Sequence, residues 1–259
     1  MKLFIIFILL FSGCSNSKWM SWKKEKPLEV ELEYYREFSN QDYIDHLENY
    51  KNVYLVDKKN QITTLSKDNT EYLEGLVKRI TENNELFFNQ VKKPTFYVIQ
   101  SEIPFHFSLP GRVFFFSSSL IKRYIKNETM LYCLISYELI RSERALYKKT
   151  IIIPTGTIST SRILAILRLD TANKVEIHKW AFYILKRIGI DTDSYLSWLQ
   201  IKNRNSLDFT LQLGDMQSIS REEALFKSFL IEEVKSIKKV PLYKGSSRKF
   251  YTFLNNIKR

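Results

Sequence analysis

Two consecutive stretches decide the fold of this chain: Phe105-His-Phe-Ser-Leu-Pro-Gly-Arg112 and Val113-Phe-Phe-Phe-Ser-Ser-Ser-Leu-Ile121. Aromatic and branched apolar residues dominate 105–109 and 113–116, which predicts two extended segments. Pro110-Gly111 between them is a turn signal. The serines that follow can cap a short helix, so the sequence predicts a hairpin and then a helix near the middle of the chain.

Helices are predicted on both sides of this hairpin, because apolar residues recur there at helical spacing. The expected helices are 68–88, 117–124, 128–148, 161–169, 171–188, 191–201 and 220–237. Further strands are expected at 94–100 and at 52–56. The sequence therefore predicts an α+β fold that is mostly helical, with a small sheet.

The order of strand, Pro-Gly hairpin, short helix and long helix resembles the HtpX-like zinc metallopeptidases, the gluzincin family that includes the CAAX prenyl endopeptidases and the BepA-type periplasmic proteases. The long helix of that family carries His-Glu-x-x-His, in which two imidazoles bind zinc and the glutamate takes a proton from the zinc-bound water. The counterpart here is Leu134-Ile-Ser-Tyr-Glu-Leu-Ile-Arg141. The resemblance covers about residues 68–235 and implies a zincin-like domain, placed at 68–238.

The chain departs from this family at the zinc ligands. Tyr137 and Arg141 stand at the two histidine positions. Tyrosine is a poor ligand at neutral pH because its pKa is about 10, and arginine has no lone pair to give. The resemblance, aligned on the Gly-Ile-Asp that begins at Gly189, puts the third ligand at Lys174, with Glu176 as the alternative. We therefore expect no metal, no cofactor and no catalysis.

Glu138 is the remaining member of the motif, and two roles are open to it. It can act as a general base, or it can form an ion pair with Arg141 on its own helix or with Lys174 on a later one. The three histidines, His46, His106 and His178, are far apart in the sequence, so each is expected to be an ordinary, partly exposed histidine. Cys133 lies in an apolar run, and we expect a buried, inert thiol.

Protein binding is the alternative to catalysis. In the resembled family, the hairpin beside the active-site helix offers its edge to an extended substrate. The corresponding peptide-binding edge here would consist of Phe105, Phe107, Val113 and Phe115, which could capture a peptide by strand addition. Strict alternation along the strands predicts that half of these side chains fill the core instead.

The N-terminus resembles a bacterial lipoprotein signal. Met1-Lys2, an apolar run to Phe11 and Ser12-Gly13 precede Cys14. The run is about half of the ~20 residues that span a bilayer. We expect a signal peptide at 1–13, lipidation of Cys14, a tether at 14–30 and a segment of unclear role at 31–67. Ser15 after the cysteine implies the periplasmic face of the outer membrane. The alternative is an ordinary secretory signal with an incidental cysteine.

The net charge is +12, and eight Lys/Arg residues without any Asp or Glu lie in 235–259. The basic tail, 239–259, can attract anionic lipid, and the alternative is a solvated tail that packs in part. We do not expect nucleic acid as a partner of an envelope lipoprotein. Three functions follow: an inactive pseudopeptidase that binds envelope proteins, an active zinc peptidase with unusual ligands, or a structural lipoprotein that docks on anionic lipid.

Overall fold

The computed structural model describes residues 40–85, 88, 92–147, 156–214, 216–234 and 245–258. These residues are mostly helical and contain one four-stranded mixed sheet, which confirms the α+β class. The helices are α2 (Asn40–Val56), α3 (Lys67–Glu82), η2 (Leu120–Tyr124), α4 (Glu128–Glu143), α5 (Thr160–Ile166), α6 (Thr171–Arg187), α7 (Asp193–Arg204), α8 (Thr210–Leu213), α9 (Met216–Val234) and α10 (Arg248–Lys258). The strands are β1 (Ile62–Thr63), β2 (Thr95–Ile99), β3 (His106–Leu109) and β4 (Val113–Ser117).

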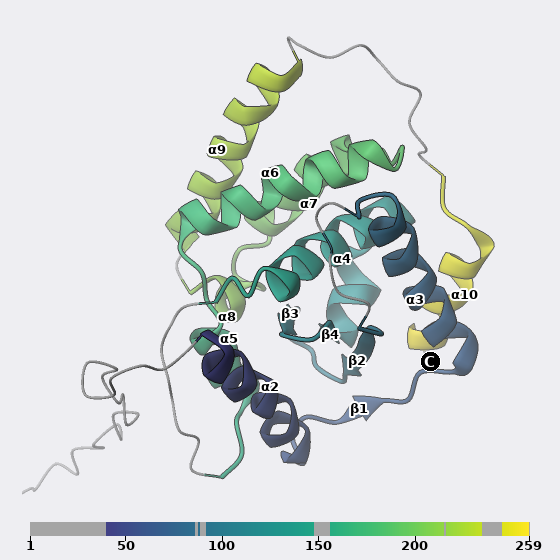
Figure 1. Cartoon of the computed structure of the whole chain (residues 1–259), viewed down its shortest axis with the longest axis vertical. Coiled ribbons are helices and arrows are strands. Elements are labelled where there is room, and N and C mark those ends of the chain that lie inside the picture. The colour runs from purple at the N-terminus through teal and green to yellow at the C-terminus, as the bar shows by residue number, and fades with distance from the viewer. Residues whose placement is uncertain are drawn as a thin grey trace, which may run out of the picture.

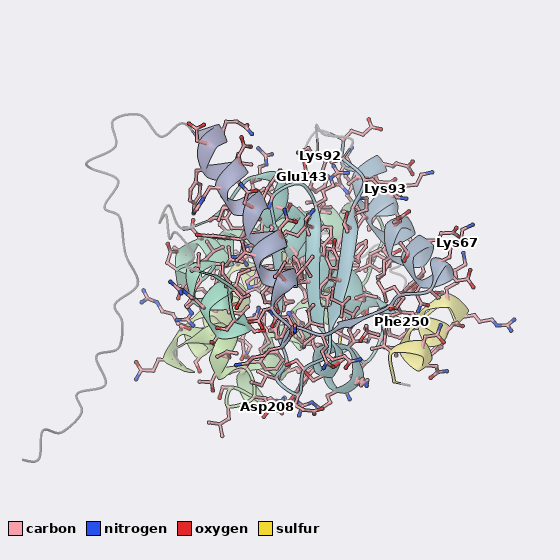
Figure 2. All side chains as sticks on the ribbon, turned by 90° about the horizontal axis from the view of Figure 1, so that it is seen from below. Lys67, Lys92, Lys93, Glu143, Asp208 and Phe250 are labelled. Atoms are coloured by element: carbon pink, nitrogen blue, oxygen red, sulfur yellow. The ribbon has the colours of Figure 1, made fainter. Side chains whose placement is uncertain are left out.

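The sheet has the order β1-β2-β4-β3, in which β2 and β4 are parallel and the other two pairs are antiparallel. The predicted hairpin is confirmed as β3 and β4. Its turn places both Gly111 and Arg112 at positive φ, a conformation that glycine adopts without strain and other residues rarely adopt. The Arg112 N–H donates to Ser142 Oγ at 2.9 Å, which fixes the turn to the end of α4. Figure 2 shows Lys92 and Glu143 at this end of the sheet, and the Arg112 side chain binds both residues.

Successive residues of β3 point to opposite faces of the sheet, and this alternation decides what each face contacts. Phe107 pairs with Phe115 on the face covered by α2 and α5, where Tyr54 packs edge-on against both rings at 5.4 Å. Phe114 and Phe116 belong to the core on the other side, with α3 and α4. His106 and Ser108 pair with these residues and therefore face α4.

The strand predicted at 52–56 is wrong, because these residues form the last turns of α2. Val53 to Val56 are consecutive apolar residues, as in a short buried strand, but Leu47, Tyr50 and Tyr54 recur at helical spacing and bury one helix face on the sheet. The helix predicted at 68–88 also ends earlier, at Glu82. The side chain of Asn84 donates to the Ile80 carbonyl at 2.9 Å and satisfies one of the carbonyls left free at the helix end.

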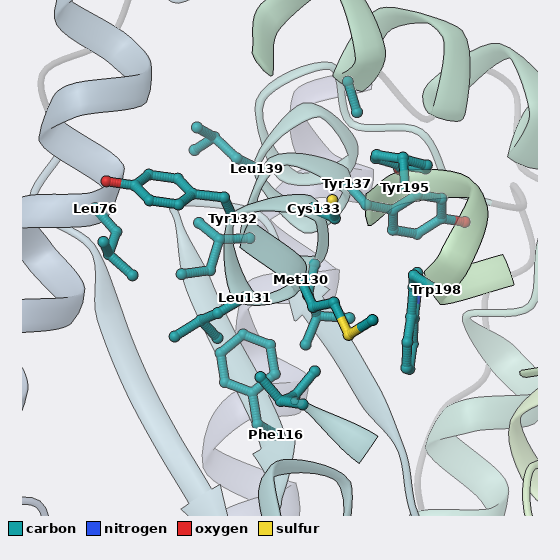
Figure 3. Close-up of a cluster of buried hydrophobic side chains, with 14 of the residues drawn as sticks. Leu76, Phe116, Met130, Leu131, Tyr132, Cys133, Tyr137, Leu139, Tyr195 and Trp198 are labelled. Atoms are coloured by element: carbon teal, nitrogen blue, oxygen red, sulfur yellow. The ribbon is translucent and has the colours of Figure 1, made fainter. Parts of the chain in front are cut away.

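Helix α4 is the central element of the fold. It runs between the sheet and the group formed by α6, α7 and α9 (Figure 1), and its residues from Glu128 to Ser142 are all buried. Figure 3 shows the apolar side chains around it, with Leu76 of α3 on one side and Trp198 of α7 on the other. Cys133 is buried among them, and burial raises the pKa of its thiol well above the usual value, as expected for an inert cysteine.

Part of the basic tail is an ordered helix. In α10, the side chains of Phe250, Phe253, Leu254 and Ile257 are buried in the core formed with α3 and η2. Figure 2 shows Phe250 where α10, in yellow, meets the rest of the protein.

Glu128, at the start of α4, fixes the segment that leads into α10. Its carboxylate accepts hydrogen bonds from the Ser247 N–H at 2.9 Å, the Ser247 hydroxyl at 2.7 Å and the Tyr72 hydroxyl at 2.8 Å. The prediction of a tail that packs in part is therefore confirmed for the described residues 245–258.

Candidate functional site

Glu138 lies in the middle of α4 with its side chain fully buried. Its Oε1 is 2.5 Å from His106 Nδ1, and its Oε2 accepts a hydrogen bond from the Ser108 hydroxyl at 2.6 Å. Arg141 Nη1 lies 3.8 Å from Oε2. The ion pair predicted with Arg141 is therefore present, at a long distance, whereas the closest contacts come from β3.

Charge on this carboxylate is stabilised by its neighbours. Burial alone would raise the pKa of Glu138, but the hydrogen bonds from His106 and Ser108 and the charge of Arg141 hold it below its usual value. Burial lowers the pKa of His106, which therefore stays neutral at pH 7. Because Glu138 is an acceptor, the proton of His106 lies on Nδ1, and Nε2 carries a lone pair.

A second buried carboxylate, Glu222 on α9, lies across α6 from the first. Its Oε1 is 2.6 Å from His178 Nε2 and 2.9 Å from Lys202 Nζ. Lys174 Nζ is 3.8 Å from Oε2. Burial would raise the pKa of Glu222, but the Lys202 charge and the His178 hydrogen bond hold it well below its usual value. These contacts connect α6, α7 and α9.

His178 is also neutral, because burial lowers its pKa to about 4. Its Nε2–H therefore donates to Glu222, and its Nδ1 accepts a hydrogen bond from the Tyr195 hydroxyl at 2.8 Å. Burial raises the pKa of Tyr195 well above its usual value, which keeps this hydroxyl a donor. Both ring nitrogens of His178 are thus occupied.

The two carboxylate clusters meet at Tyr137. Its ring centroid is 5.9 Å from that of His106 and 4.9 Å from that of His178. A cavity of about 30 Å³ lies between the clusters. Its lining residues are His106, Tyr137, Lys174, His178, Trp198, Lys202, Gln212, Leu213 and Glu222.

The donor set at this cavity does not fit zinc. Burial raises the pKa of Tyr137 far above its usual value, so the phenol keeps its proton. The Arg141 guanidinium donates to the Leu167 carbonyl and has no lone pair to give to a metal. Lys174 and Lys202 add two ammonium groups that repel a dication. Among the residues that the structure describes, no group of three or more His, Cys, Asp or Glu side chains is arranged to hold a metal.

Lys174, rather than Glu176, faces the cavity. Lys174 is buried and pairs with Glu222 instead of with Glu138, so the predicted Glu138–Lys174 pair is wrong. Glu176 is exposed and lines a separate, apolar pocket with Ile140 and Trp180. Two residues correspond to about 200° around a helix, so the side chains point to opposite sides.

The expectation of partly exposed histidines holds for His46 and is wrong for the other two. His106 and His178 are 3% and 1% exposed, and both line the cavity. Side chains alternate between the two sheet faces along His106-Phe-Ser-Leu109, and this alternation could have placed His106 with Ser108 against α4. The i,i+4 spacing of Lys174 and His178 puts these two residues on one helix face. No local sequence signal indicates Glu222, because it lies on another helix, 44 residues after His178.

The peptide-binding edge is predicted incorrectly at two residues. Val113 and Phe115 belong to β4, which lies inside the sheet between β2 and β3. Phe105 and Phe107, at the β3 edge, have fully buried side chains.

The outer backbone groups of β3 already have a partner at His106. The His106 N–H donates to Gln212 Oε1 at 3.3 Å, and Gln212 Nε2 donates to the His106 carbonyl at 2.7 Å. A side-chain amide thus occupies the place of a neighbouring strand's peptide group.

Cys14 and the segments 1–13 and 14–30 lie outside the described residues. Among the residues that the structure describes, no helix has the length and apolar character needed to cross a bilayer. No protein-family model matches this chain, and none of the curated proteins matches it either.

Proposed function

We propose that this chain is a membrane-anchored, metallopeptidase-like protein that has lost its zinc ligands and acts by binding envelope proteins. One observation carries the proposal. Tyr137 and Lys174, which stand where the resemblance expects zinc ligands, line one cavity beside the Glu138 helix, and neither suits the metal. The carboxylate that would serve as the base is held by His106 and Ser108.

The arrangement of the helices supports the relation to the HtpX-like family. Glu138 lies on a buried helix packed beside the hairpin, and Lys174 comes from the later helix that packs across it. These are the relative places that the resemblance gives to the glutamate and to the third ligand. The zincin-like fold is part of this proposal.

Binding requires a surface, and the β3 edge is the candidate. Gln212 pairs there with the His106 backbone through two hydrogen bonds, and its amide lies where the peptide group of a neighbouring strand would lie. An extended segment of a partner would replace this side chain and continue the pairing along Ser108. The partner is therefore an unfolded or extended polypeptide of the cell envelope.

The anchor would be the lipidated Cys14, on the periplasmic face of the outer membrane. Replacement of Cys14 by Ser should release the protein from the membrane fraction and remove incorporated palmitate. Retention of the Cys14→Ser protein in the membrane fraction would contradict the anchor.

Two measurements on the full chain in detergent test the loss of catalysis. Elemental analysis should find no stoichiometric zinc, and an unfolded protein substrate should remain intact over the time in which an active metallopeptidase degrades it. Stoichiometric zinc, together with cleavage that Glu138→Gln abolishes, would overturn the proposal and favour a peptidase with unusual ligands.

Binding is tested by fluorescence anisotropy with a labelled, unfolded outer-membrane polypeptide. Saturable binding is expected, and competition by the unlabelled polypeptide should reverse it. Absence of saturable binding at concentrations up to about 1 mM, equivalent to a binding free energy of about −4 kcal/mol, would contradict a binding role.

Docking on anionic lipid is a second candidate, favoured by the exposed Arg248 and Lys249 on α10. The apolar face of α10 is buried in the protein, so charge alone would attract the lipid. Vesicles that contain anionic lipid provide the test, because each Lys or Arg near such a surface contributes about 1 kcal/mol. Binding that Arg248→Glu with Lys249→Glu abolishes would support this role.

A further inference from the structure

Two buried acceptor atoms beside the Tyr137 cavity have no hydrogen-bond partner among the described residues: His106 Nε2 and Glu222 Oε2. Both belong to residues that line the cavity of about 30 Å³, and both residues are at least nine-tenths buried. Buried polar atoms in folded proteins are nearly always hydrogen-bonded to protein or to water. The two atoms therefore point to a ligand in this cavity.

The orientation of His106 follows from its other nitrogen. Nδ1 is held by Glu138, and Glu138 is not among the residues that line the cavity. The opposite side of the imidazole, which carries Nε2, is therefore the side that borders the cavity. Since the proton lies on Nδ1, this atom presents a lone pair.

Glu222 presents an acceptor from the other side. Its Oε1 is occupied by His178 and Lys202. Its Oε2 has Lys174 at 3.8 Å, beyond hydrogen-bond distance. The cavity is thus bordered by two acceptors, one from β3 and one from α9, with the Tyr137 phenol and the Lys174 ammonium beside them.

We infer that the cavity is a binding site for one water molecule, which donates one hydrogen bond to His106 Nε2 and the other to Glu222 Oε2. The volume is sufficient, since a water needs at least about 10–15 Å³. A cation is disfavoured by Lys174 and Lys202, and an anion is disfavoured by the two acceptors. A neutral molecule that donates two hydrogen bonds avoids both the repulsion by the ammonium groups and the repulsion by the acceptors.

This water would complete a chain of hydrogen bonds across the fold. The chain runs from Ser108 through Glu138 and His106 to the water, and then through Glu222 and His178 to Tyr195. It would connect α4 and β3 with α6, α7 and α9. The water would thus serve as the link between helices that zinc provides in the resembled family.

A high-resolution crystal structure of the full chain in detergent is the first test. We expect density for one water about 2.7–3.2 Å from both His106 Nε2 and Glu222 Oε2. Diffraction data collected above and below the zinc absorption edge distinguish a metal from a water. Absence of density between the two atoms, an anomalous metal signal, or an anion in the cavity would each overturn the inference.

The protonation of His106 gives a second test in solution, which needs no variant. The chain has three histidines, so nitrogen NMR of ¹⁵N-histidine-labelled protein shows three rings. We expect His106 to carry its proton on Nδ1, with Nε2 unprotonated and hydrogen-bonded. A proton on Nε2, or a charged imidazolium at pH 7, would contradict the site.

Two matched histidine variants test whether the water depends on His106 itself. His106→Phe removes the lone pair and should eliminate the water density. His46→Phe changes the histidine whose Nε2 pairs with Tyr50 on α2, and it should leave the density unchanged. Persistence of the water in a folded His106→Phe protein would count against the proposed donor geometry.

Discussion

The two buried carboxylates beside the cavity differ in how their charge is balanced. Glu138 is held mainly by neutral donors, His106 and Ser108, with a guanidinium at 3.8 Å. Glu222 is held by a neutral histidine and two ammonium groups, the nearer at 2.9 Å. Removal of Glu222 would therefore leave buried cations uncompensated, whereas removal of Glu138 would mainly leave neutral groups without partners. The first is the more costly change.

The largest expected effect is that of Glu222→Ala. Breaking a buried ion pair by removing one partner costs about 3–5 kcal/mol, because the remaining charge stays buried. Urea unfolding should show a decrease of this size in the free energy of unfolding. Glu232→Ala, at an exposed position of the same helix, is the control and should cost less than about 1 kcal/mol. Equal effects of the two changes would contradict the difference in burial.

Acid should destabilise the protein first through its two buried histidines, because burial lowers the pKa of both His106 and His178. The pKa of His178 is about 4 in the folded protein, against 6.5 for an ordinary histidine. Above pH 6.5 the His178 side chain is neutral in both the folded and the unfolded protein, so the free energy of unfolding does not depend on its titration there. As the pH falls from 6.5 towards 4, the unfolded chain takes up the proton before the folded one, and stability is lost, on the order of 3 kcal/mol.

This loss is measured as the free energy of unfolding at pH 7 and at pH 4.5. His178→Gln should make this dependence less steep, with the remainder coming from His106, and His46→Gln should leave it unchanged. The lowered pKa values of Glu138 and Glu222 contribute in a separate window, because their stabilisation is lost only as the pH falls below about 4.5. A wild-type profile that is flat from pH 7 to 4.5 would contradict a neutral, buried His178.

Glu138→Ala should have a smaller effect than Glu222→Ala, about 2–3 kcal/mol. It removes hydrogen bonds to a charged acceptor and leaves His106 Nδ1 without its partner, whereas the Ser108 hydroxyl can still donate to the backbone carbonyl of residue 138. Glu138→Gln should cost less, since the amide oxygen can still accept from one donor. The free energies of unfolding of both variants and of Glu222→Ala, measured in urea, rank the contributions of the two carboxylates to stability. A larger loss for Glu138→Ala than for Glu222→Ala would reverse the comparison.

The smallest expected effect is that of Gln212→Ala, which exposes the backbone of His106 at the β3 edge. Loss of two neutral hydrogen bonds on a partly exposed residue should cost roughly 0.5–1.5 kcal/mol. Under the proposed function, the same change should strengthen binding of an extended polypeptide by roughly two- to tenfold, because the competing amide is gone. Gln200→Ala on α7 is the matched control, and anisotropy titration is the measurement. Weaker binding by Gln212→Ala would contradict competition at this edge.

Sequence patterns predicted the hairpin, the helices around it and the α+β class, because these features depend on local periodicity. They failed at 52–56, where a short run of consecutive apolar residues hides the helical face that Tyr50 and Tyr54 bury on the sheet. They also placed β4 at an edge, because a sequence shows that two strands form a hairpin but does not show that β2 pairs with β4 from the other side.

The polar cavity was predicted in part. Tyr137, Glu138 and Lys174 were placed from a motif and a resemblance, and the structure brings Tyr137 and Lys174 to one cavity beside Glu138. Glu222 could not be predicted, because its partners come from other helices through tertiary packing. The burial of His106 and His178 depends on the same packing.

The contact between Glu128 and Ser247 has a consequence for the order in which the protein is made. The two residues are separated by 119 positions, so the start of α4 exists long before its partner is synthesised. Until residues 247–257 are available, the Glu128 carboxylate, the Tyr72 hydroxyl and the surface that receives Phe250 remain uncovered during synthesis. A chaperone that shields this surface from the newly made chain would therefore have to leave before α10 docks.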